Sequence, residues 1–493
     1  MKLSRQSLKE NAWQEKGFIL PSFDIEEITE NTNKKPTWIH FGVGNIFRAF
    51  PAVCMQKLLN ERASNTGIIG VGVSLKSFDN LTCSVSLKSD GRMENTIVAS
   101  ITETLTIDED FARMKEIFMA DSIQMVSFTI TEKGYVVSED PKAALRVLAE
   151  LLYERFQENK PAIALVSMDN CANNGDLLKK IMLRTAQKYY DESFANYLKN
   201  LSFPITMIDK ITPRPSEIVG NKLKELGYEV KATIFDSFGA PVSSFVNAEE
   251  SEYLVIEDIF PNGRPPLEKA GVVFTDRETV ESIEKMKVGA CLNPLHTIIA
   301  IFGSLLSIEF VHEAMKNEAL VNLIKECGYN ESLPFVPDPG VISPKAFIDE
   351  VLQKRFPNPF IPDEPSRIAT DTSLKVPIRF GEVLKTMQNR GKDITELSAI
   401  PFFVAGWFRY LTKINEEGNS FTPSPDPNLQ ELTSIFEGIK LGDELPIDAI
   451  GLLRRSDIFG INIISLASKI KTYFDELNKE KGSIQNTLNK YWL

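Results

Sequence analysis

The hydrophobic pattern divides the chain into two parts of different character. In the first part, short apolar runs recur at 38–41, 67–75, 122–131 and 162–170, with helix-like segments between them. Apolar runs of this length are typical of strands that are buried on both faces of a parallel sheet. In the second part, from about residue 285, the apolar residues repeat at helical spacing. The pattern predicts an α/β fold, with a mostly parallel sheet in the N-terminal domain and a mostly α-helical C-terminal domain.

Helical periodicity is clearest in seven windows, and the earliest of them follows the first predicted strand. The residues up to about 36 are polar, so we expect an irregular N-terminal segment. A Pro/Gly-rich loop and the apolar run VVF come near the end of the sheet region, and we place the domain boundary there, giving domains 1–284 and 285–493. The predicted helices are 47–59, 141–157, 297–315, 319–327, 343–356, 376–389 and 400–412.

Size and charge restrict the classes of partner. The chain has 493 residues, more than one hydrophobic core usually supports, which agrees with two domains. A net charge of −12 disfavours nucleic acid and anionic membrane surfaces as main partners. The uncharged run 288–308 would be long enough to span a bilayer, but it contains Asn293, Pro294 and His296, so we expect a buried helix. The N-terminus lacks the apolar region of a signal peptide, and we expect a cytoplasmic protein.

The cysteines and histidines give no metal signature. The five cysteines are odd in number and include no C-x-x-C pair, which disfavours structural zinc and a disulfide framework. The three histidines have no H-E-x-x-H spacing. We therefore expect no catalytic metal.

A glycine-rich turn follows the first predicted strand. Gly42 and Gly44 lie between a strand and a helix, which is the context of the dinucleotide-binding fingerprint. Phe47 occupies the position of the third glycine, so the motif is incomplete and a purely structural turn is the alternative. Asp79 follows the second predicted strand, where an acidic residue would bind the adenosine ribose and favour NAD over NADP. Lys76 nearby weakens that preference.

The stretch MKVGACLNPLHT carries the clearest candidate chemistry. Lys287 borders a mostly apolar run, and loss of hydration disfavours an ammonium ion, which gives a physical route to a lysine general base. Asn293 and His296 are three residues apart and would share one face of a helix, where they would bind and orient a substrate oxygen. The alternative is structural, with Asn293 capping a helix that Pro294 begins and His296 lying in the core.

Other polar residues lie where an active site would need them. Asp169 and Asn170 end a predicted parallel strand, and the carboxyl ends of such strands are where α/β sheets bind ligands. Asp209 lies in an apolar stretch before a lysine, for which a surface ion pair is the alternative. Arg367 and Lys375 bring two cations to the helical part, for which a solvated helix face is the alternative.

Six segments in the same order along most of the chain resemble the polyol-specific long-chain dehydrogenases, the family of mannitol 2-dehydrogenase and fructuronate reductase. The resemblance implies a Rossmann-type NAD-binding domain, a helical domain and an active site between them. It also implies metal-free hydride transfer between NAD and a sugar-derived secondary alcohol. The segments are FGVGNIFRAF, TITEKGY, SMDNCANNG, MIDKITP, VIEDIFPNGRPPLEKAGVVF and MKVGACLNPLH.

The same resemblance gives the candidate catalytic residues their roles. Lys287 matches the general base of the family, and Glu284 matches a carboxylate that relays its proton. Asn293 and His296 match the residues that bind and polarise the reacting oxygen. Asn170 matches a second amide at that oxygen.

The remaining matches concern the substrate chain and the cofactor. The loop before Asn293 departs from the family, because five residues separate it from Lys287 where four are common, so we expect a local bulge or a shifted start. Asp209, Arg367 and Lys375 match positions that contact the rest of the substrate. The implied cofactor-binding residues are Gly42, Gly44, Asn45, Ile46, Asp79, Thr131 and Glu132.

The favoured activity is the interconversion of a hexuronate and a hexonate, D-fructuronate and D-mannonate, with NAD. Arg367 and Lys375 would meet the substrate carboxylate. Mannitol 2-dehydrogenase and tagaturonate reductase are the alternatives, because the segments FGVGNIFRAF and SEYL lean toward the tagaturonate branch and NGRPPLEKAG toward the mannonate and mannitol branch. A non-catalytic NAD-binding protein and a zinc-dependent alcohol dehydrogenase are alternatives from other classes. The sequence does not indicate the oligomeric state or the physiological direction.

Overall fold

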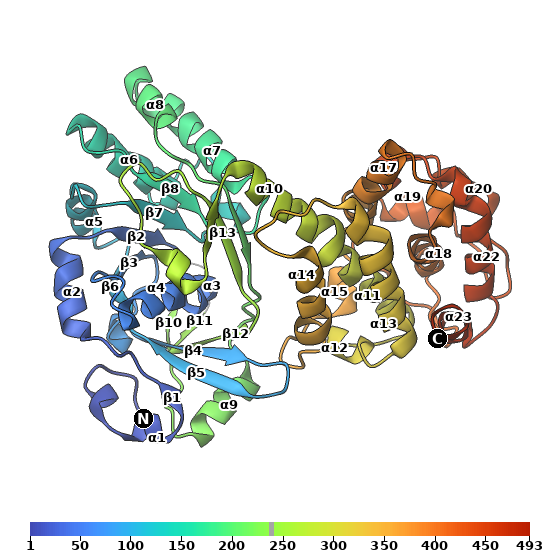
Figure 1. Ribbon diagram of the computed structural model, residues 1–493, viewed down its shortest axis with the longest axis horizontal. Helices are drawn as coiled ribbons and strands as arrows, with labels where there is room; N and C mark the ends of the chain where they lie inside the picture. Colours follow the sequence, from blue (N-terminus) through green and yellow to red (C-terminus); the bar gives the residue numbers. More distant parts are fainter. Residues whose placement is uncertain (236–240) are drawn as a thin grey trace. The chain divides into compact units, whose positions relative to one another are not determined.

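The computed structural model describes residues 1–235 and 241–493 (Figure 1). The chain forms two compact units, residues 1–281 and residues 282–493. The division falls within helix α10 (Arg277–Met286), shortly before the boundary that we expected at 284/285.

A five-stranded parallel sheet forms the centre of the first unit, in the order β6-β3-β2-β7-β8. In chain order these strands are numbered 3-2-1-4-5, as in a doubly wound nucleotide-binding sheet, and the order reverses between β2 and β7. The four apolar runs are confirmed as strands, the first with the predicted bounds and the other three with shorter ones, whereas β6 was not predicted. The bounds are β2 (Trp38–Phe41), β3 (Ile68–Val71), β6 (Ile101–Leu105), β7 (Met125–Phe128) and β8 (Ala164–Ser167).

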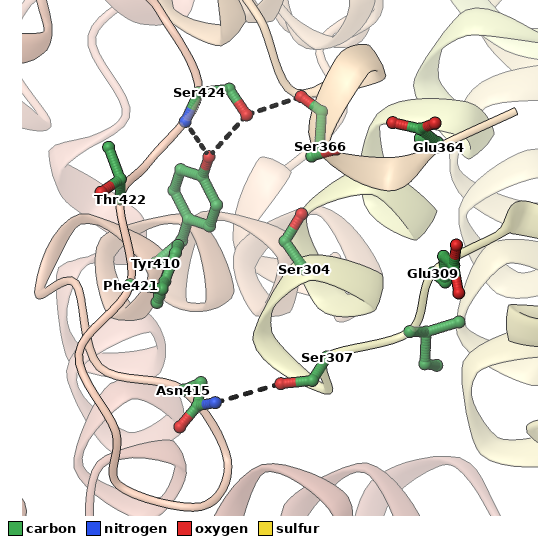
Figure 2. A pocket seen from close by; sticks show the side chains of 11 residues that line it. Ser304, Ser307, Glu309, Glu364, Ser366, Tyr410, Asn415, Phe421, Thr422 and Ser424 are labelled. Carbon is green, nitrogen blue, oxygen red and sulfur yellow. Dashed lines mark hydrogen bonds between the residues drawn. The ribbon is translucent and has the colours of Figure 1, made fainter.

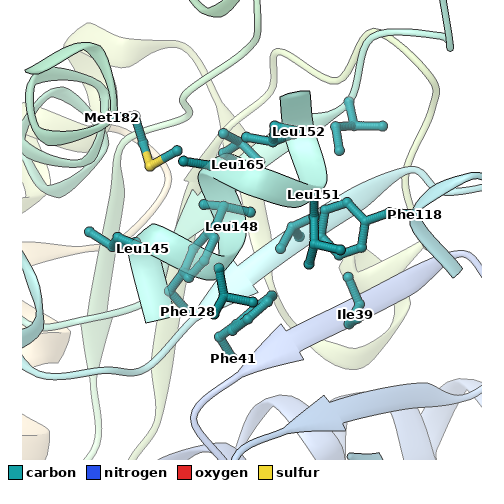
Figure 3. Close-up of a cluster of buried hydrophobic side chains, with 14 of the residues drawn as sticks. Ile39, Phe41, Phe118, Phe128, Leu145, Leu148, Leu151, Leu152, Leu165 and Met182 are labelled. Atoms are coloured by element: carbon teal, nitrogen blue, oxygen red, sulfur yellow. The ribbon is translucent and has the colours of Figure 1, made fainter. Parts of the chain in front are cut away.

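Helix α6 (Ala144–Gln157) covers one face of this sheet and shows why the local sequence is helical. Its leucines recur at three- and four-residue spacing, so one side of the helix is apolar. Figure 3 shows these leucines packed with aromatic side chains from β2 and β7. Each buried leucine contributes about 1.5 to 3 kcal/mol. Around α6 pack α5 (Phe111–Phe118), α7 (Asn174–Tyr189) and α8 (Glu192–Lys199).

Smaller sheets extend the first unit. Strand β13 runs antiparallel to β9 and parallel to β14. Strand β14 contains most of the apolar run VVF that was noted near the end of this region. A second sheet has the order β1-β5-β4-β12, and β10 pairs with β11. The bounds are β1 (Phe18–Ile19), β4 (Thr82–Leu87), β5 (Met93–Val98), β9 (Thr206–Asp209), β10 (Ala232–Phe235), β11 (Pro241–Ser243), β12 (Phe245–Glu249), β13 (Tyr253–Glu257) and β14 (Val273–Thr275). Helix α9 (Glu217–Glu225) belongs to the same unit.

The N-terminal segment is not irregular, so that prediction was wrong. Helix α1 (Ala12–Glu15) is followed by α2 (Ile25–Lys34), which begins after Asp24, whose carboxylate accepts the N–H of Glu27 at 3.0 Å. The fully buried Thr32 hydroxyl accepts the N–H of Gly67 at 2.8 Å. The buried face of α2 consists of only Ile28 and Thr32, which is too little apolar periodicity to be read from the sequence.

The helix predicted over 47–59 begins earlier and is broken in two. Helix α3 (Asn45–Ala49) ends at Phe50, and α4 (Pro51–Asn60) begins directly afterwards. Proline has no N–H and disfavours a helical conformation in the residue before it, and Phe50 has φ −134°.

Helices carry almost all the regular structure of the second unit, as predicted. Several predicted helices are interrupted by π-helical turns, which insert one extra residue into the helix. At the centre, α18 (Ala399–Leu411) is buried along its whole length and packs against α11 and α22. The main helices are α11 (Asn293–Leu305), α12 (Val311–Ala314), α13 (Glu318–Lys325), α14 (Pro344–Glu350), α15 (Pro365–Ile368), α16 (Thr372–Val376), α17 (Glu382–Asn389), α19 (Leu429–Ser434), α20 (Ile447–Leu452), α21 (Ser456–Phe459), α22 (Ala467–Leu477) and α23 (Ser483–Trp492).

The helical stretch Arg277–Leu305 is long and apolar enough to cross a membrane by length and composition alone. In the structure, 78% of its apolar window is buried within the protein. This agrees with the buried helix that we expected.

Candidate functional site

The two glycines of the predicted cofactor turn have different structural roles. Gly42 has φ +106°, and a Cβ atom there would lie 2.1 Å from the carbonyl oxygen of Thr129. Gly44 has φ −82°, and a Cβ atom there would meet nothing within 4 Å. Gly42 is thus required by the fold itself, whereas Gly44 borders open space that a phosphate group could approach. Asn45 and Ile46 begin helix α3 directly after this turn.

A buried histidine connects the turn to the neighbouring strand. In the ring of His40, Nδ1 lies 2.6 Å from Ser127 Oγ, and Nε2 lies 2.8 Å from Thr129 Oγ1. Nε2 also lies 3.1 Å from the Gly42 carbonyl oxygen. Burial lowers the pKa of His40 to about 3, so the imidazole is neutral. Phe47 stacks on this ring with a centroid distance of 4.0 Å, which explains why the third glycine position holds an aromatic residue.

Asp169 holds the turn that follows β7. Its carboxylate accepts the N–H groups of Ile130 at 3.0 Å and Thr131 at 2.9 Å, and the hydroxyl of Tyr135 at 2.7 Å. Thr131 has φ +63°, an unusual conformation for a β-branched residue. Desolvation raises the pKa of Asp169, against the hydrogen bonds that favour its charged form. This network fixes the backbone at Thr131, one of the predicted cofactor residues, just before the exposed Glu132.

Asn170 differs from the residue before it. Its side chain is exposed at the carboxyl end of β8, and no other residue in the described part of the chain binds its amide. The amide is therefore available to a ligand. Its role at the reacting oxygen stays a prediction.

Asp79 follows the second strand of the parallel sheet, β3, at the end of the short helical turn Lys76–Phe78. It has a left-handed conformation, and its Oδ2 accepts the N–H of Arg5 at 2.9 Å. Its role as a ribose-binding residue stays a prediction. It lines a pocket of about 480 Å³ with Arg5, Thr29, Asn33, Lys76, Asn80, Thr102 and Glu103.

Asp209 is buried at the end of β9, opposite Tyr253 of β13. The lysine that follows it does not form the exposed ion pair that was the alternative for this motif. The Lys210 side chain is only 4% exposed, and its ammonium donates to Glu252 at 2.8 Å. Both residues are thus part of the buried structure of the first unit.

In the second unit, Lys287 begins a π-helical turn that ends at Cys291. The N–H of Leu292 closes the turn by donating to the carbonyl of Lys287 at 3.2 Å. This π-helical turn is the bulge that we expected from the extra residue in this loop. The Lys287 residue is 5% exposed, among buried neighbours such as Ala290. Glu284 lies one helical turn earlier and is half-buried.

Asn293 is the first residue of α11 rather than its N-cap, so the capping alternative was wrong. Leu292 occupies the capping position, and no side chain there accepts a helix N–H. The carbonyl of Asn293 accepts the hydroxyl of Thr297 at 2.8 Å, but no other residue of the described chain binds its side-chain amide. A half-buried amide with no protein partner is suited to bind a substrate oxygen.

His296 lies beside a carboxylate that sequence analysis did not identify. Its Nε2 is 2.8 Å from Asp363 Oδ2, although the ring N–H is not aligned for a regular hydrogen bond. The ring also stacks on Phe356 with a centroid distance of 5.1 Å. Burial lowers the pKa of His296, and Asp363 opposes that effect. Arg367 pairs with the same carboxylate, so Asp363 joins two predicted site residues.

The predicted cation Lys375 has an unexpected arginine as its neighbour. The ammonium of Lys375 donates to the carbonyls of Ile368 at 3.0 Å and of Thr370, and burial lowers its pKa. Arg379 lies on the next turn and donates through Nη1 to Thr297 Oγ1 at 2.5 Å. Sequence patterns gave no signal for Arg379 or for Asp363, because each acts on a residue more than 60 positions away.

A pocket of about 440 Å³ also lies within the second unit (Figure 2). Two of its hydroxyl groups bind protein atoms in sequence: Tyr410 donates to Ser424 Oγ at 3.1 Å, and Ser424 donates to the backbone carbonyl of Ser366 at 2.6 Å. None of the predicted site residues lines this pocket, so it is not the predicted active site. The lining residues are Ser304, Ser307, Ile308, Glu309, Glu364, Ser366, Tyr410, Asn415, Phe421, Thr422 and Ser424.

The strand order, the glycine turn and the buried lysine define a Rossmann-type dehydrogenase with a helical C-terminal domain. Two family models match the chain: the mannitol dehydrogenase Rossmann domain over residues 36–269 and the mannitol dehydrogenase C-terminal domain over residues 279–477. The chain belongs to the mannitol dehydrogenase family.

Individual relatives cover almost the whole chain. D-mannonate oxidoreductase of Thermotoga maritima is 41% identical and covers 99% of each sequence. The ternary complex of Pseudomonas fluorescens mannitol 2-dehydrogenase with NAD and D-mannitol has a TM-score of 0.69 at 25% identity, over 99% of each chain. D-sorbitol dehydrogenase in its substrate-free form has a TM-score of 0.81 at 24% identity, over 99% of this chain and 100% of the other, and supports the fold.

Proposed function

We propose that this protein is an NAD-dependent oxidoreductase that interconverts D-fructuronate and D-mannonate. The observation that carries the proposal is the match to D-mannonate oxidoreductase, at 41% identity over 99% of both sequences. Mannitol 2-dehydrogenase, the first alternative, resembles the chain less closely, at 30% identity over 80% of this chain for the enzyme of Emericella nidulans. The physical features of each unit support the same reaction class.

The first unit fits a dinucleotide. The space beside Gly44 would admit a pyrophosphate, and the turns at Gly42 and Thr131 are held rigidly by His40 and Asp169. Bound NAD supplies the acceptor or donor of the hydride, and the protein orients it. We assign cofactor contacts to the backbone of these turns and to Asn45, Ile46, Asp79 and Glu132.

The second unit supplies the proton chemistry. In oxidation, Lys287 in its neutral form takes the proton of the substrate hydroxyl, and in reduction its ammonium returns the proton to the new alkoxide oxygen. The Asn293 amide, which binds no other group among the described residues, donates a hydrogen bond to that oxygen and stabilises its developing negative charge. His296, held neutral by burial and oriented by Asp363, acts on the same oxygen. We assign Glu284 to the exchange of the Lys287 proton with solvent.

The test is to supply NADH with D-fructuronate, D-tagaturonate and D-fructose in separate assays and to follow the loss of NADH absorbance. We expect the highest kcat/KM with D-fructuronate. Faster turnover of D-fructose than of either uronate would overturn the proposed substrate. A parallel assay after exhaustive chelation distinguishes the metal-free reaction, for which we expect full activity, from a zinc-dependent alcohol dehydrogenase.

A further inference from the structure

Arg379 is a half-buried cation with no carboxylate partner in the described parts of the chain. Its Nη1 donates to Thr297 Oγ1 at 2.5 Å and to the carbonyl of Asn293 at 3.4 Å. Its Nε and Nη2 have no protein partner among the described residues, and neither atom is sealed from solvent. One edge of the guanidinium therefore holds helix α11, while the other edge is open to a ligand.

The neighbouring cations are already engaged. Arg367 pairs with Asp363, and the ammonium of Lys375 donates to two backbone carbonyls. Burial lowers the pKa of Arg379 to about 10, so the group is still charged at neutral pH, and no carboxylate of the described residues pairs with it. A buried charge is costly to maintain without a partner, unless a bound anion supplies one.

The position of Arg379 places this charge beside the predicted substrate groups. Asn293 and Thr297 lie on the same helical turn of α11 as His296. The positive charge of Arg379 also contributes to the lowered pKa values of His296 and Lys375, which is an effect of proximity. A ligand bound to the Asn293 amide would thus lie within reach of the guanidinium.

We propose that Arg379 determines specificity for sugar acids by binding the substrate carboxylate through the open edge of its guanidinium. Arginine presents two parallel N–H donors that match the two oxygens of a carboxylate, and such charge-assisted pairs are stronger than neutral hydrogen bonds. This inference rests on the proposed function, since it identifies the group that distinguishes a hexuronate from a neutral ketose.

The test is the steady-state kinetics of Arg379→Gln with NADH and D-fructuronate, and with D-fructose as the neutral substrate. We expect KM for D-fructuronate to rise roughly 10- to 100-fold, because a charged hydrogen-bonding pair is lost, while kcat changes only a few-fold. KM for D-fructose should change much less. Arg454→Gln, which removes an exposed arginine of the same unit, serves as the matched control and should behave as the wild type.

An unchanged KM for D-fructuronate would overturn the inference, and so would equal losses with both substrates, which would show a structural role in holding α11. If Arg379→Gln fails to fold, Arg379→Lys carries the test, because it keeps the charge and loses the paired donors. We expect its KM for D-fructuronate to rise several-fold at nearly constant kcat, and an unchanged KM again overturns the inference. Absence of D-fructuronate turnover in the wild-type enzyme would instead reject the proposed function.

Discussion

The polar groups of the two units differ in whether other protein groups bind them. In the first unit, buried side chains such as His40 and Asp169 bind other protein groups and fix the backbone of two turns. In the second unit, the Asn293 amide and one edge of the Arg379 guanidinium have no protein partner among the described residues. The first unit thus offers mainly a rigid backbone, which suits a cofactor, and the second offers side chains, which suit a reaction that needs proton transfer and substrate selection.

The substitution of Gly42 is expected to have the largest effect, and it tests the role of the backbone in the first unit. In Gly42→Ala, the alanine would have to adopt a φ of +106°, and its Cβ atom would lie 2.1 Å from the Thr129 carbonyl oxygen. The free energy of unfolding should therefore fall by about 2 to 5 kcal/mol. NADH affinity should fall with it, because the turn moves. Denaturant unfolding and NADH titration measure the two effects.

Gly44→Ala is the matched variant, because its Cβ atom would have no atom of the described residues within 4 Å. Its unfolding free energy should stay within about 0.5 kcal/mol of the wild type. Its NADH affinity should nevertheless fall, since the added methyl group would fill space assigned to the cofactor. Unchanged NADH affinity in Gly44→Ala would contradict the assignment of that space.

Asn293→Ala tests the side-chain role of the second unit. Removing a preorganised donor to a developing negative charge costs about 10²- to 10³-fold in kcat, whereas NADH affinity should not change. Asn389→Ala, at an exposed asparagine at the end of α17, is the control. A kcat that matches the control variant would show that the Asn293 amide does not act on the reacting oxygen.

The last effect is confined to acidic pH and concerns the stability due to the neutral His40. Its pKa is about 3 in the folded protein and 6.5 in the unfolded chain, so the unfolded state binds more protons between these values. The stability due to neutral His40 is therefore complete above pH 6.5 and is lost as the pH falls toward 3, by up to about 1.4 kcal/mol per pH unit. The free energy of unfolding of His40→Gln should decline less steeply over this range, and parallel curves would contradict the assignment.

The first unit could be predicted from sequence because its signals are local. Four of its central strands are continuous apolar runs, and Gly42 and Gly44 follow one of them directly. The fold class and the family that these motifs indicated are confirmed. The mostly polar α2, whose buried residues are only Ile28 and Thr32, and the break at Pro51 were not predicted, because each depends on burial or on a single proline within an apolar segment.

The candidate site of the second unit was predictable only in part. Lys287, Asn293 and His296 lie close together in the sequence, and the extra residue between the first two indicated a local irregularity, which the structure forms as a π-helical turn. Asp363 and Arg379 reach these residues from distant helical turns, and such contacts depend on how the helices pack. The roles of all these residues in catalysis and binding stay predictions.

The central claim is that Lys287 carries the proton while the first unit binds the cofactor. The most direct measurement is turnover of D-fructuronate by Lys287→Ala together with its equilibrium affinity for NADH, with the exposed Lys325→Ala as control. We expect a loss of about 10²- to 10⁴-fold in kcat, with the NADH affinity of the wild type and a fully active control. Wild-type turnover by Lys287→Ala would show that Lys287 does not carry the proton.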